Sequence, residues 1–121
     1  MRFVGKVRSG VGQSSGHMSI MQHKINSRLQ CDVLPGSLNL LLDKPVYLKN
    51  QIRISTTHYP YPYYFYPCVV NGIDMFIMRP PMNKSPYKFE LVATFKLRDK
   101  FQLVNGDLLE VDVNEKYINK L

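Results

Sequence analysis

Two oxygen-bearing side chains stand two residues apart in the segment LPGSLNLLLD, residues 34–43. In an extended strand Ser37 and Asn39 point to one face, while the leucines beside them point to the other. A hydroxyl and an amide carbonyl are hard oxygen ligands, so this pair could hold Mg²⁺ together with water and phosphate oxygens. The alternative is a structural role, in which Ser37 caps the preceding Pro-Gly turn and Asn39 bonds a neighbouring loop.

A glycine- and serine-rich segment, SGVGQSSGHMS at residues 9–19, follows the first expected strand. Gly10 and Gly12 let the backbone turn with its N–H groups exposed, and Ser14 and Ser15 add hydroxyl donors. Such a segment can bind phosphate through a nest of amides. It lacks both the Gly-Lys-Ser/Thr of a Walker A loop and the third glycine of a dinucleotide-binding fingerprint, so it indicates neither of those folds. An ordinary glycine turn is the alternative.

The segment HYPYPYYFYP, residues 58–67, holds six aromatic residues and three prolines. Because proline lacks the N–H that a β-ladder needs, we do not expect a regular central strand here. The rings could form an aromatic wall for a planar ligand, or stack on unpaired bases. The alternative is a proline-stiffened edge segment whose tyrosines cover one end of the domain.

Alternating and turn-bounded segments predict a mostly β chain. Strands are expected within residues 2–12, 37–43, 51–57, 64–70, 74–79, 88–95 and 108–113. Asn71-Gly72 predicts a hairpin, since both residues tolerate positive φ. A short amphipathic helix is expected over 19–30, with Ser19 as its N-cap, and a further helical turn over 97–103. At this size a small closed barrel protects the strand edges, and an OB-type barrel is the rival architecture.

Composition limits the classes of partner. The 121-residue chain carries 16 Lys and Arg against 9 Asp and Glu, a formal net charge of +7. That charge favours an anionic partner, although the basic residues are scattered rather than clustered. The length suits one domain, residues 1–121. The first ten residues contain no apolar signal region and no apolar run has membrane length, so we expect a cytoplasmic location, reduced thiols and no membrane partner. Cys31 and Cys68 have no metal-ligand neighbours, so we expect no zinc site.

Three segments, in this order, resemble the archaeal CTP-dependent riboflavin kinases: GKVRSGVG, PGSLNLLLD and FELVATFKLRDKFQLVNGDLLEV. In that family a G-x-G-x-G loop, a G-[TS]-L-N-L strand and a K-L-R segment followed by a G-D hairpin recur. The resemblance covers residues 3–19, 33–43 and 85–113. It implies a small closed six-stranded cradle-loop (RIFT-type) barrel with one or two short helices.

The resemblance also implies roles for individual residues. The family's loop for the nucleotide phosphates corresponds to Gly10, Val11, Gly12, Gln13, Ser14 and Ser15. Its second nucleotide-binding segment corresponds to Phe95, Lys96, Leu97 and Arg98. Ser37 and Asn39 match the two metal-binding side chains. Glu90 matches an acidic residue that contacts the flavin, which makes it the candidate catalytic carboxylate, orienting the acceptor or accepting its proton.

The chain departs from the family pattern in three places. Ser14 stands where the third loop glycine would be. A flavin-contacting threonine falls at Met82, for which Ser85 is a possible substitute, and the stretch 44–80 is shorter than in the archaeal enzymes. From these departures we expect that the acceptor pocket is rebuilt around the 58–67 tract.

We therefore expect a Mg²⁺-dependent phosphotransferase that moves the γ-phosphate of CTP to riboflavin, giving FMN and CDP, and that acts as a monomer. A kinase of the same family acting on a different small hydroxyl acceptor is one alternative, and a non-catalytic nucleotide- or flavin-binding module is another. A single-strand nucleic-acid binder of OB type would use the charge and the tyrosines. It leaves the pair Ser37 and Asn39 unexplained, so we do not expect a nucleic-acid partner.

Overall fold

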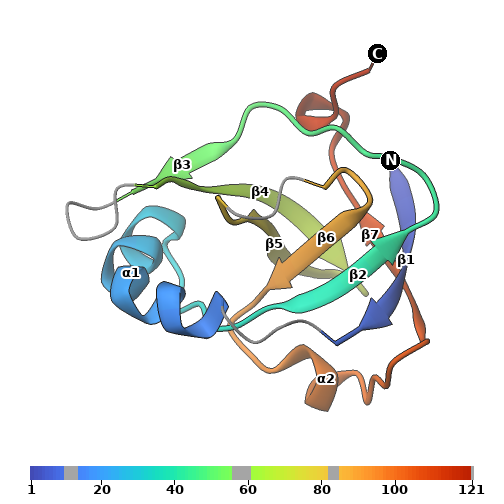
Figure 1. Ribbon diagram of the computed structural model, residues 1–121, viewed down its shortest axis with the longest axis horizontal. Helices are drawn as coiled ribbons and strands as arrows, with labels where there is room; N and C mark the ends of the chain where they lie inside the picture. The colour runs from blue at the N-terminus through green and yellow to red at the C-terminus, as the bar shows by residue number, and fades with distance from the viewer. Residues whose placement is uncertain (10–13, 56–60, 82–84, 121) are drawn as a thin grey trace.

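The computed structural model describes residues 1–9, 14–55, 61–81 and 85–120, which fold mainly into antiparallel strands (Figure 1). The strands are β1 (Arg2–Arg8), β2 (Leu38–Leu42), β3 (Ile52–Ile54), β4 (Tyr63–Val70), β5 (Ile73–Arg79), β6 (Lys88–Val92) and β7 (Leu108–Asp112). The helical elements are α1 (Ser14–Leu29), α2 (Leu97–Lys100) and the 3-10 turn η1 (Glu115–Tyr117). No helix within these ranges is long and apolar enough to cross a membrane.

The strands close into a barrel. Each pairs antiparallel with its neighbours, in the order β3-β4-β5-β6-β2-β1-β7. The ring closes where Val69 of β4 pairs with Asp112 of β7, which leaves β3 outside the ring beside β4. Closure removes free strand edges that would otherwise invite aggregation. The predicted closed six-stranded barrel is confirmed.

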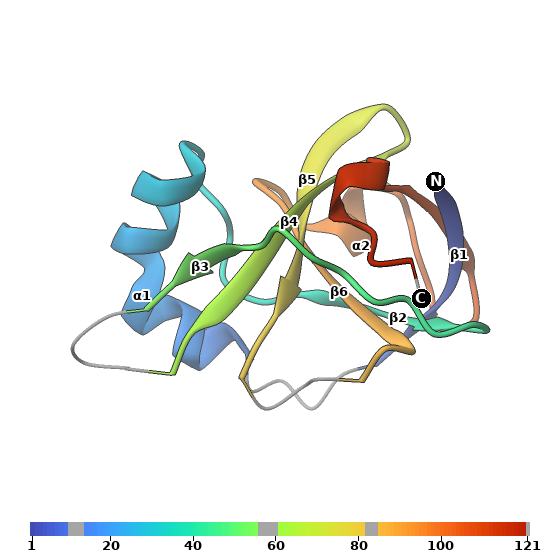
Figure 2. The same cartoon turned by 90° about the horizontal axis from the view of Figure 1, so that it is seen from above.

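Strand alternation divides the apolar residues between two cores. The barrel interior is filled from all six strands of the ring, with Leu38, Leu40 and Leu42 as the contribution of β2. The second core lies outside the barrel, where α1 covers β3 and β4 (Figure 2). Its helical side consists of Met18, Met21, Ile25 and Leu29, and its strand side consists of Ile54, Tyr63, Phe65, Met78 and Val92.

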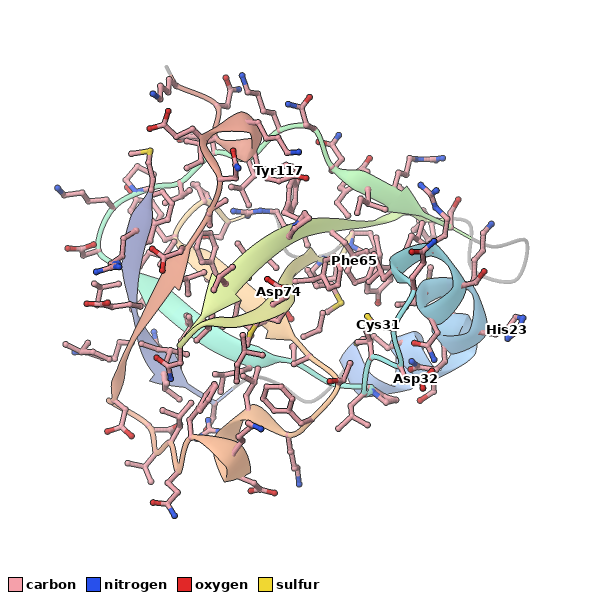
Figure 3. The ribbon with its side chains drawn as sticks, turned by 180° about the vertical axis from the view of Figure 1, so that it is seen from behind. His23, Cys31, Asp32, Phe65, Asp74 and Tyr117 are labelled. Carbon is pink, nitrogen blue, oxygen red and sulfur yellow. The ribbon has the colours of Figure 1, made fainter. Side chains whose placement is uncertain are left out.

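Figure 3 shows Cys31 and Phe65 together at this second core, while His23 of α1 points into solvent. Cys68 lies in the barrel interior, and both cysteines are free thiols. Burial raises the pKa of Cys68 to about 12. The two thiols therefore behave as small apolar groups, one in each core.

Gly5 allows β1 and β2 to lie close together in the barrel wall. It is buried and pairs with Leu42, and a Cβ added to it would lie 2.7 Å from the Cβ of Leu40. Because that Cβ is attached directly to the backbone of β2, a larger residue at Gly5 would push the two strands apart.

The predicted Asn71-Gly72 hairpin is confirmed. Asn71 and Gly72 have φ values of 52° and 74°, and they join β4 to β5. Gly106 has a φ of 97° and turns the chain from α2 toward β7. These are left-handed conformations, which asparagine tolerates and glycine adopts freely.

The predicted start of the first helix is wrong. The helix α1 begins at Ser14, so Ser19 lies inside it and is not its N-cap. Ile20 is 59% exposed, because the apolar stripe of α1 runs through Met18 and Met21 instead. The glycines and polar residues before Ser19 hide this stripe in the sequence.

The prediction that the aromatic tract forms no regular central strand is wrong for residues 63–67, which belong to β4; residues 58–60 lie outside the described ranges. At Tyr64 and Phe65, β4 has β3 on one side and β5 on the other. Pro67 is tolerated because β3 ends opposite Phe65 and β7 pairs only at Val69, so β4 has one neighbour there.

Candidate active site on the outer face of the barrel

Ser37, Asn39 and Glu90 meet on the outer face of the barrel. Leu38 and Leu40 face the interior, so Asn39 between them points outward, and the β2–β6 register places it opposite Glu90. The Ser37 hydroxyl donates a hydrogen bond of 3.0 Å to Oε1 of Glu90. The structure therefore brings the two predicted metal ligands and the predicted catalytic carboxylate together.

Glu90 is the one charged side chain that the described ranges bury, at 5% exposure. A buried carboxylate is costly unless hydrogen bonds compensate for lost water, and Ser37 supplies one such bond. Because the hydroxyl donates its proton to the carboxylate, its oxygen lone pairs remain open to a cation. Together with the Asn39 carbonyl oxygen they form a hard-oxygen donor set that suits Mg²⁺.

No group of three or more His, Cys, Asp or Glu side chains among the described residues could hold a metal ion. A metal held by Ser37 and Asn39 would have a hydroxyl and an amide oxygen as protein ligands, with phosphate oxygens and water completing its shell. Mg²⁺ commonly accepts few protein ligands when it accompanies a nucleotide.

The segment 95–98 lies beside the end of β1. Arg98 donates from Nη2 to the carbonyl oxygen of Arg8 at 3.3 Å and to Oδ1 of Asn105 at 2.7 Å. Asn105 Nδ2 in turn donates to Oγ of Ser9 at 2.8 Å. Because Ser9 directly precedes the predicted phosphate loop, this network holds the second predicted nucleotide segment at the entrance to the first.

The other residues of 95–98 differ in what they offer a ligand. Leu97 is buried in the barrel core, so only its backbone is available. Lys96 is exposed and immediately precedes α2. Phe95 packs edge-on against Phe101 with ring centroids 6.0 Å apart, and Nζ of Lys100 lies 4.8 Å from the Phe95 centroid.

The predicted phosphate loop falls largely outside the described residues. This holds for Gly10, Val11, Gly12 and Gln13, and for the side chains of Ser14 and Ser15. The helix α1 begins at Ser14, whereas the sequence predicted that the loop would continue to Ser19. A glycine segment that leads into a helix N-terminus suits phosphate, because free N–H groups and the helix dipole both favour anions.

Two further residues, Met82 and Ser85, were predicted to contact the acceptor. Of these, the structure describes only Ser85, because Met82 lies outside the described ranges. Ser85 occupies the connection between β5 and β6, where its Oγ accepts a hydrogen bond of 3.2 Å from the backbone N–H of Tyr87. Its carbonyl oxygen accepts a hydrogen bond of 2.7 Å from Nη1 of Arg79. Its predicted contact with the flavin stays a prediction.

Arg79 was missed in the sequence, where nothing distinguishes it from the other basic residues. Besides Ser85, it donates from Nη2 to the carbonyl oxygen of Val46 at 3.2 Å, and it forms no ion pair with any described residue. Burial lowers the pKa of Arg79, and the nearby Tyr66 and Glu90 oppose that shift.

A pocket of about 250 Å³ opens beside Arg79. Its walls include Tyr64 and Tyr66, together with Tyr47 and three prolines of the β5–β6 connection. Part of the aromatic tract thus lines a hollow, while Tyr63 and Phe65 point the other way, beneath α1. The idea that the tract forms an aromatic wall for a planar ligand stays a prediction.

Fold and site together define a class: a small closed β-barrel that carries a hard-oxygen cluster on its outer face. Residues 7–113 match the sequence profile of the CTP-dependent riboflavin kinases, a family described as a domain of unknown function, DUF120. The chain belongs to this family.

Curated archaeal relatives match most of the chain. A riboflavin kinase of Pyrobaculum arsenaticum is 32% identical over 93% of this chain and 60% of its own length. A riboflavin kinase of Archaeoglobus fulgidus is 29% identical over 93% of this chain and 54% of its own length, so the chain spans little more than half of these relatives. A riboflavin kinase of Staphylothermus marinus is 21% identical over 96% of this chain and 94% of its own length.

Proposed function

We propose that this chain is a CTP-dependent riboflavin kinase, which transfers the γ-phosphate of CTP to riboflavin and releases FMN and CDP. The observation that carries the proposal is the cluster of Ser37, Asn39 and Glu90 on the outer face of a barrel of this family. The relatives' names support riboflavin as the acceptor. One of them is matched over 94% of its length, so the barrel alone accounts for nearly all of that protein.

On the donor side, residues 10–15 and 95–98 would bind the nucleotide. The bonds from Arg98 to Arg8 and Asn105, and from Asn105 to Ser9, support this assignment because they hold one segment at the start of the other. The net charge of +7 also favours a polyanionic ligand.

Ser37 Oγ and the Asn39 carbonyl oxygen would hold the Mg²⁺ that accompanies CTP. When bound, the ion neutralises charge on the phosphate oxygens, which lowers the barrier to phosphoryl transfer. Glu90 contributes by accepting the hydrogen bond from Ser37, which fixes the direction of that hydroxyl.

Glu90 would also act on the acceptor. The primary hydroxyl oxygen of riboflavin forms a bond to the γ-phosphorus as the bond to the β,γ-bridging oxygen breaks, and the electron pair leaves with CDP. The hydroxyl proton passes to the Glu90 carboxylate, or is oriented by it, during this step. Met82 and Ser85 would flank the acceptor. Residues 1–121 would act as one domain, as a monomer in the cytoplasm.

The test is a transfer assay with riboflavin and each of the four nucleoside triphosphates in the presence of Mg²⁺, with FMN separated by chromatography. FMN is expected with CTP. Asn39→Ala serves as the control for a kinase carried over from the expression host, since such a contaminant would be unaffected. Absence of FMN with every nucleotide rejects the proposal. CDP formed from CTP only with another alcohol supports the alternative acceptor.

A further inference from the structure

Arg8 lies on the strand next to Asn39 and adds a positive charge to the candidate site. The β1–β2 register pairs Arg8 with Asn39, and the β2–β6 register pairs Asn39 with Glu90. Val7 faces the interior, so Arg8 points outward like its two partners. Directly opposite residues on antiparallel strands have Cβ atoms about 4.5–5.5 Å apart. A row Arg8–Asn39–Glu90 therefore crosses the outer face from β1 to β6.

The charge of Arg8 is uncommitted within the described part of the chain. Its side chain is exposed and forms no hydrogen bond or ion pair there. The Arg8 carbonyl oxygen accepts a hydrogen bond from Arg98. The strand and this bond fix the position of the Arg8 backbone, while the guanidinium remains available to a ligand.

We propose that Arg8 binds the phosphates of the nucleotide and neutralises charge that develops during transfer, an inference that rests on the proposed function. The guanidinium fork matches two phosphate oxygens at once, and arginines serve this role in phosphoryl transfer. The row then places a cation on the donor side, the metal ligand Asn39 in the middle and the carboxylate Glu90 on the acceptor side. That order follows the order of the reacting groups.

Lys6 provides a matched control. It lies two residues before Arg8 on the same outward face of β1 and is also exposed. Its partners across the strands are Leu41 and Leu108, so it lies beside apolar residues rather than in the row. Lys6→Gln removes one positive charge from the same strand, which separates a local role of Arg8 from a general effect of net charge.

The experiment measures binding of cytidine, CDP and CTP by titration calorimetry with Mg²⁺, for the wild type, Arg8→Gln, Arg8→Lys and Lys6→Gln. Arg8→Gln is expected to lower the affinity for CDP and CTP roughly 10- to 100-fold, because one or two charge-assisted hydrogen bonds are lost. The affinity for cytidine should not change. Arg8→Lys is expected to fall in between. Lys6→Gln is expected to stay within about twofold of the wild type, because an exposed charge without a direct phosphate contact contributes little.

Other results would overturn the assignment. If Arg8→Gln binds CDP as the wild type does, or if Lys6→Gln loses as much affinity, Arg8 has no specific phosphate contact. Equal loss for cytidine would indicate a disturbed base site instead. A wild-type protein that binds neither CTP nor CDP rejects the proposed function and this inference together, whereas normal wild-type binding with an unaffected Arg8→Gln rejects the inference alone.

Discussion

Glu90 and Arg79 are charged side chains that the barrel shields from solvent by different means. Glu90 accepts a hydrogen bond from a side chain, the Ser37 hydroxyl. Arg79 donates to two main-chain carbonyl oxygens, those of Ser85 and Val46, which lie in connections between strands. The two residues stand on neighbouring strands, with Glu90 on the outer face and Arg79 lining the pocket at Tyr66.

Under the proposed function, this difference separates a reactive group, Glu90, from a structural one, Arg79. A hydroxyl rotates and can share its oxygen with a cation while its backbone stays in place, so the Ser37–Glu90 pair can admit a ligand. A main-chain carbonyl moves only with its loop. Arg79 therefore fastens the segments on either side of it to the barrel, and removing it should disturb folding more than chemistry.

The largest expected effect comes from Glu90→Gln. Glutamine keeps the size of the side chain and an oxygen that accepts the Ser37 hydrogen bond, but it cannot take a proton. The rate of FMN formation should fall about 10²- to 10⁴-fold, the usual contribution of a general base. The melting temperature should change little. Steady-state kinetics and thermal unfolding on one preparation measure both, and an activity within tenfold of wild type would contradict the role of Glu90.

Asn39→Ala should come next. Asn39 lies on the outer face, so its loss opens no cavity in the barrel interior. Removing a metal ligand should lower transfer activity at least about 10- to 100-fold, with partial recovery at high Mg²⁺. Leu41→Ala, on the same face of β2, is the control and should keep its activity. Activity near the wild-type level in millimolar Mg²⁺ would restore the structural role for Asn39.

Local rules predicted part of this site. Two-residue alternation placed Asn39 on the face opposite Leu38 and Leu40, and the structure agrees. The position of Glu90 opposite Asn39 could not be derived in this way, because it depends on the register between strands far apart in the sequence. The resemblance to a family supplied Glu90 instead.

Tertiary context decided what local rules predicted wrongly. The proline rule argued against a central strand at 58–67, but β3 is short enough that Pro67 lies beyond it. Arg79 carried no signal, since its partners are carbonyl oxygens that any residue provides. Its structural role depends on the tertiary positions of the two connections that carry Val46 and Ser85.

A smaller effect, on stability, is expected for Arg79→Met. Methionine keeps much of the apolar stem but leaves the carbonyl oxygens of Val46 and Ser85 without this donor. The free energy of unfolding should fall by roughly 1–3 kcal/mol. The turnover rate per folded molecule should fall far less than in Glu90→Gln. Arg53→Met, at an exposed position of β3, is the control and should change stability by less than about 0.5 kcal/mol.

Urea unfolding curves and the turnover rate of the same samples decide between the two roles. If Arg79→Met keeps full stability but loses turnover as Glu90→Gln does, the distinction between the two charges is wrong. Arg79 would then act on the substrate through the tyrosine-lined pocket beside it.

The same contrast between side-chain and main-chain partners applies to recognition of the nucleotide base by residues 95–98. The smallest effect is expected here, in the preference for CTP over other nucleotides. In the segment 95–98, the Leu97 side chain is buried and Nη2 of Arg98 already bonds Asn105 and the Arg8 carbonyl oxygen. Base recognition here would therefore depend mainly on backbone N–H and C=O groups. The 4-amino edge of cytosine needs an acceptor where uracil itself offers one.

A backbone acceptor left unpaired by the wrong base costs roughly 1–3 kcal/mol, which corresponds to a preference of about tenfold or more for CTP over UTP. Purine nucleotides should bind more weakly still, because of their size. Thermal-shift titration of the wild type with the four nucleotides in Mg²⁺ measures this order. Stabilisation grows with the logarithm of ligand concentration over Kd, so a tenfold difference in Kd appears as about 1.4 kcal/mol at saturating ligand. A larger stabilisation by ATP than by CTP would be incompatible with a pyrimidine site built from this segment.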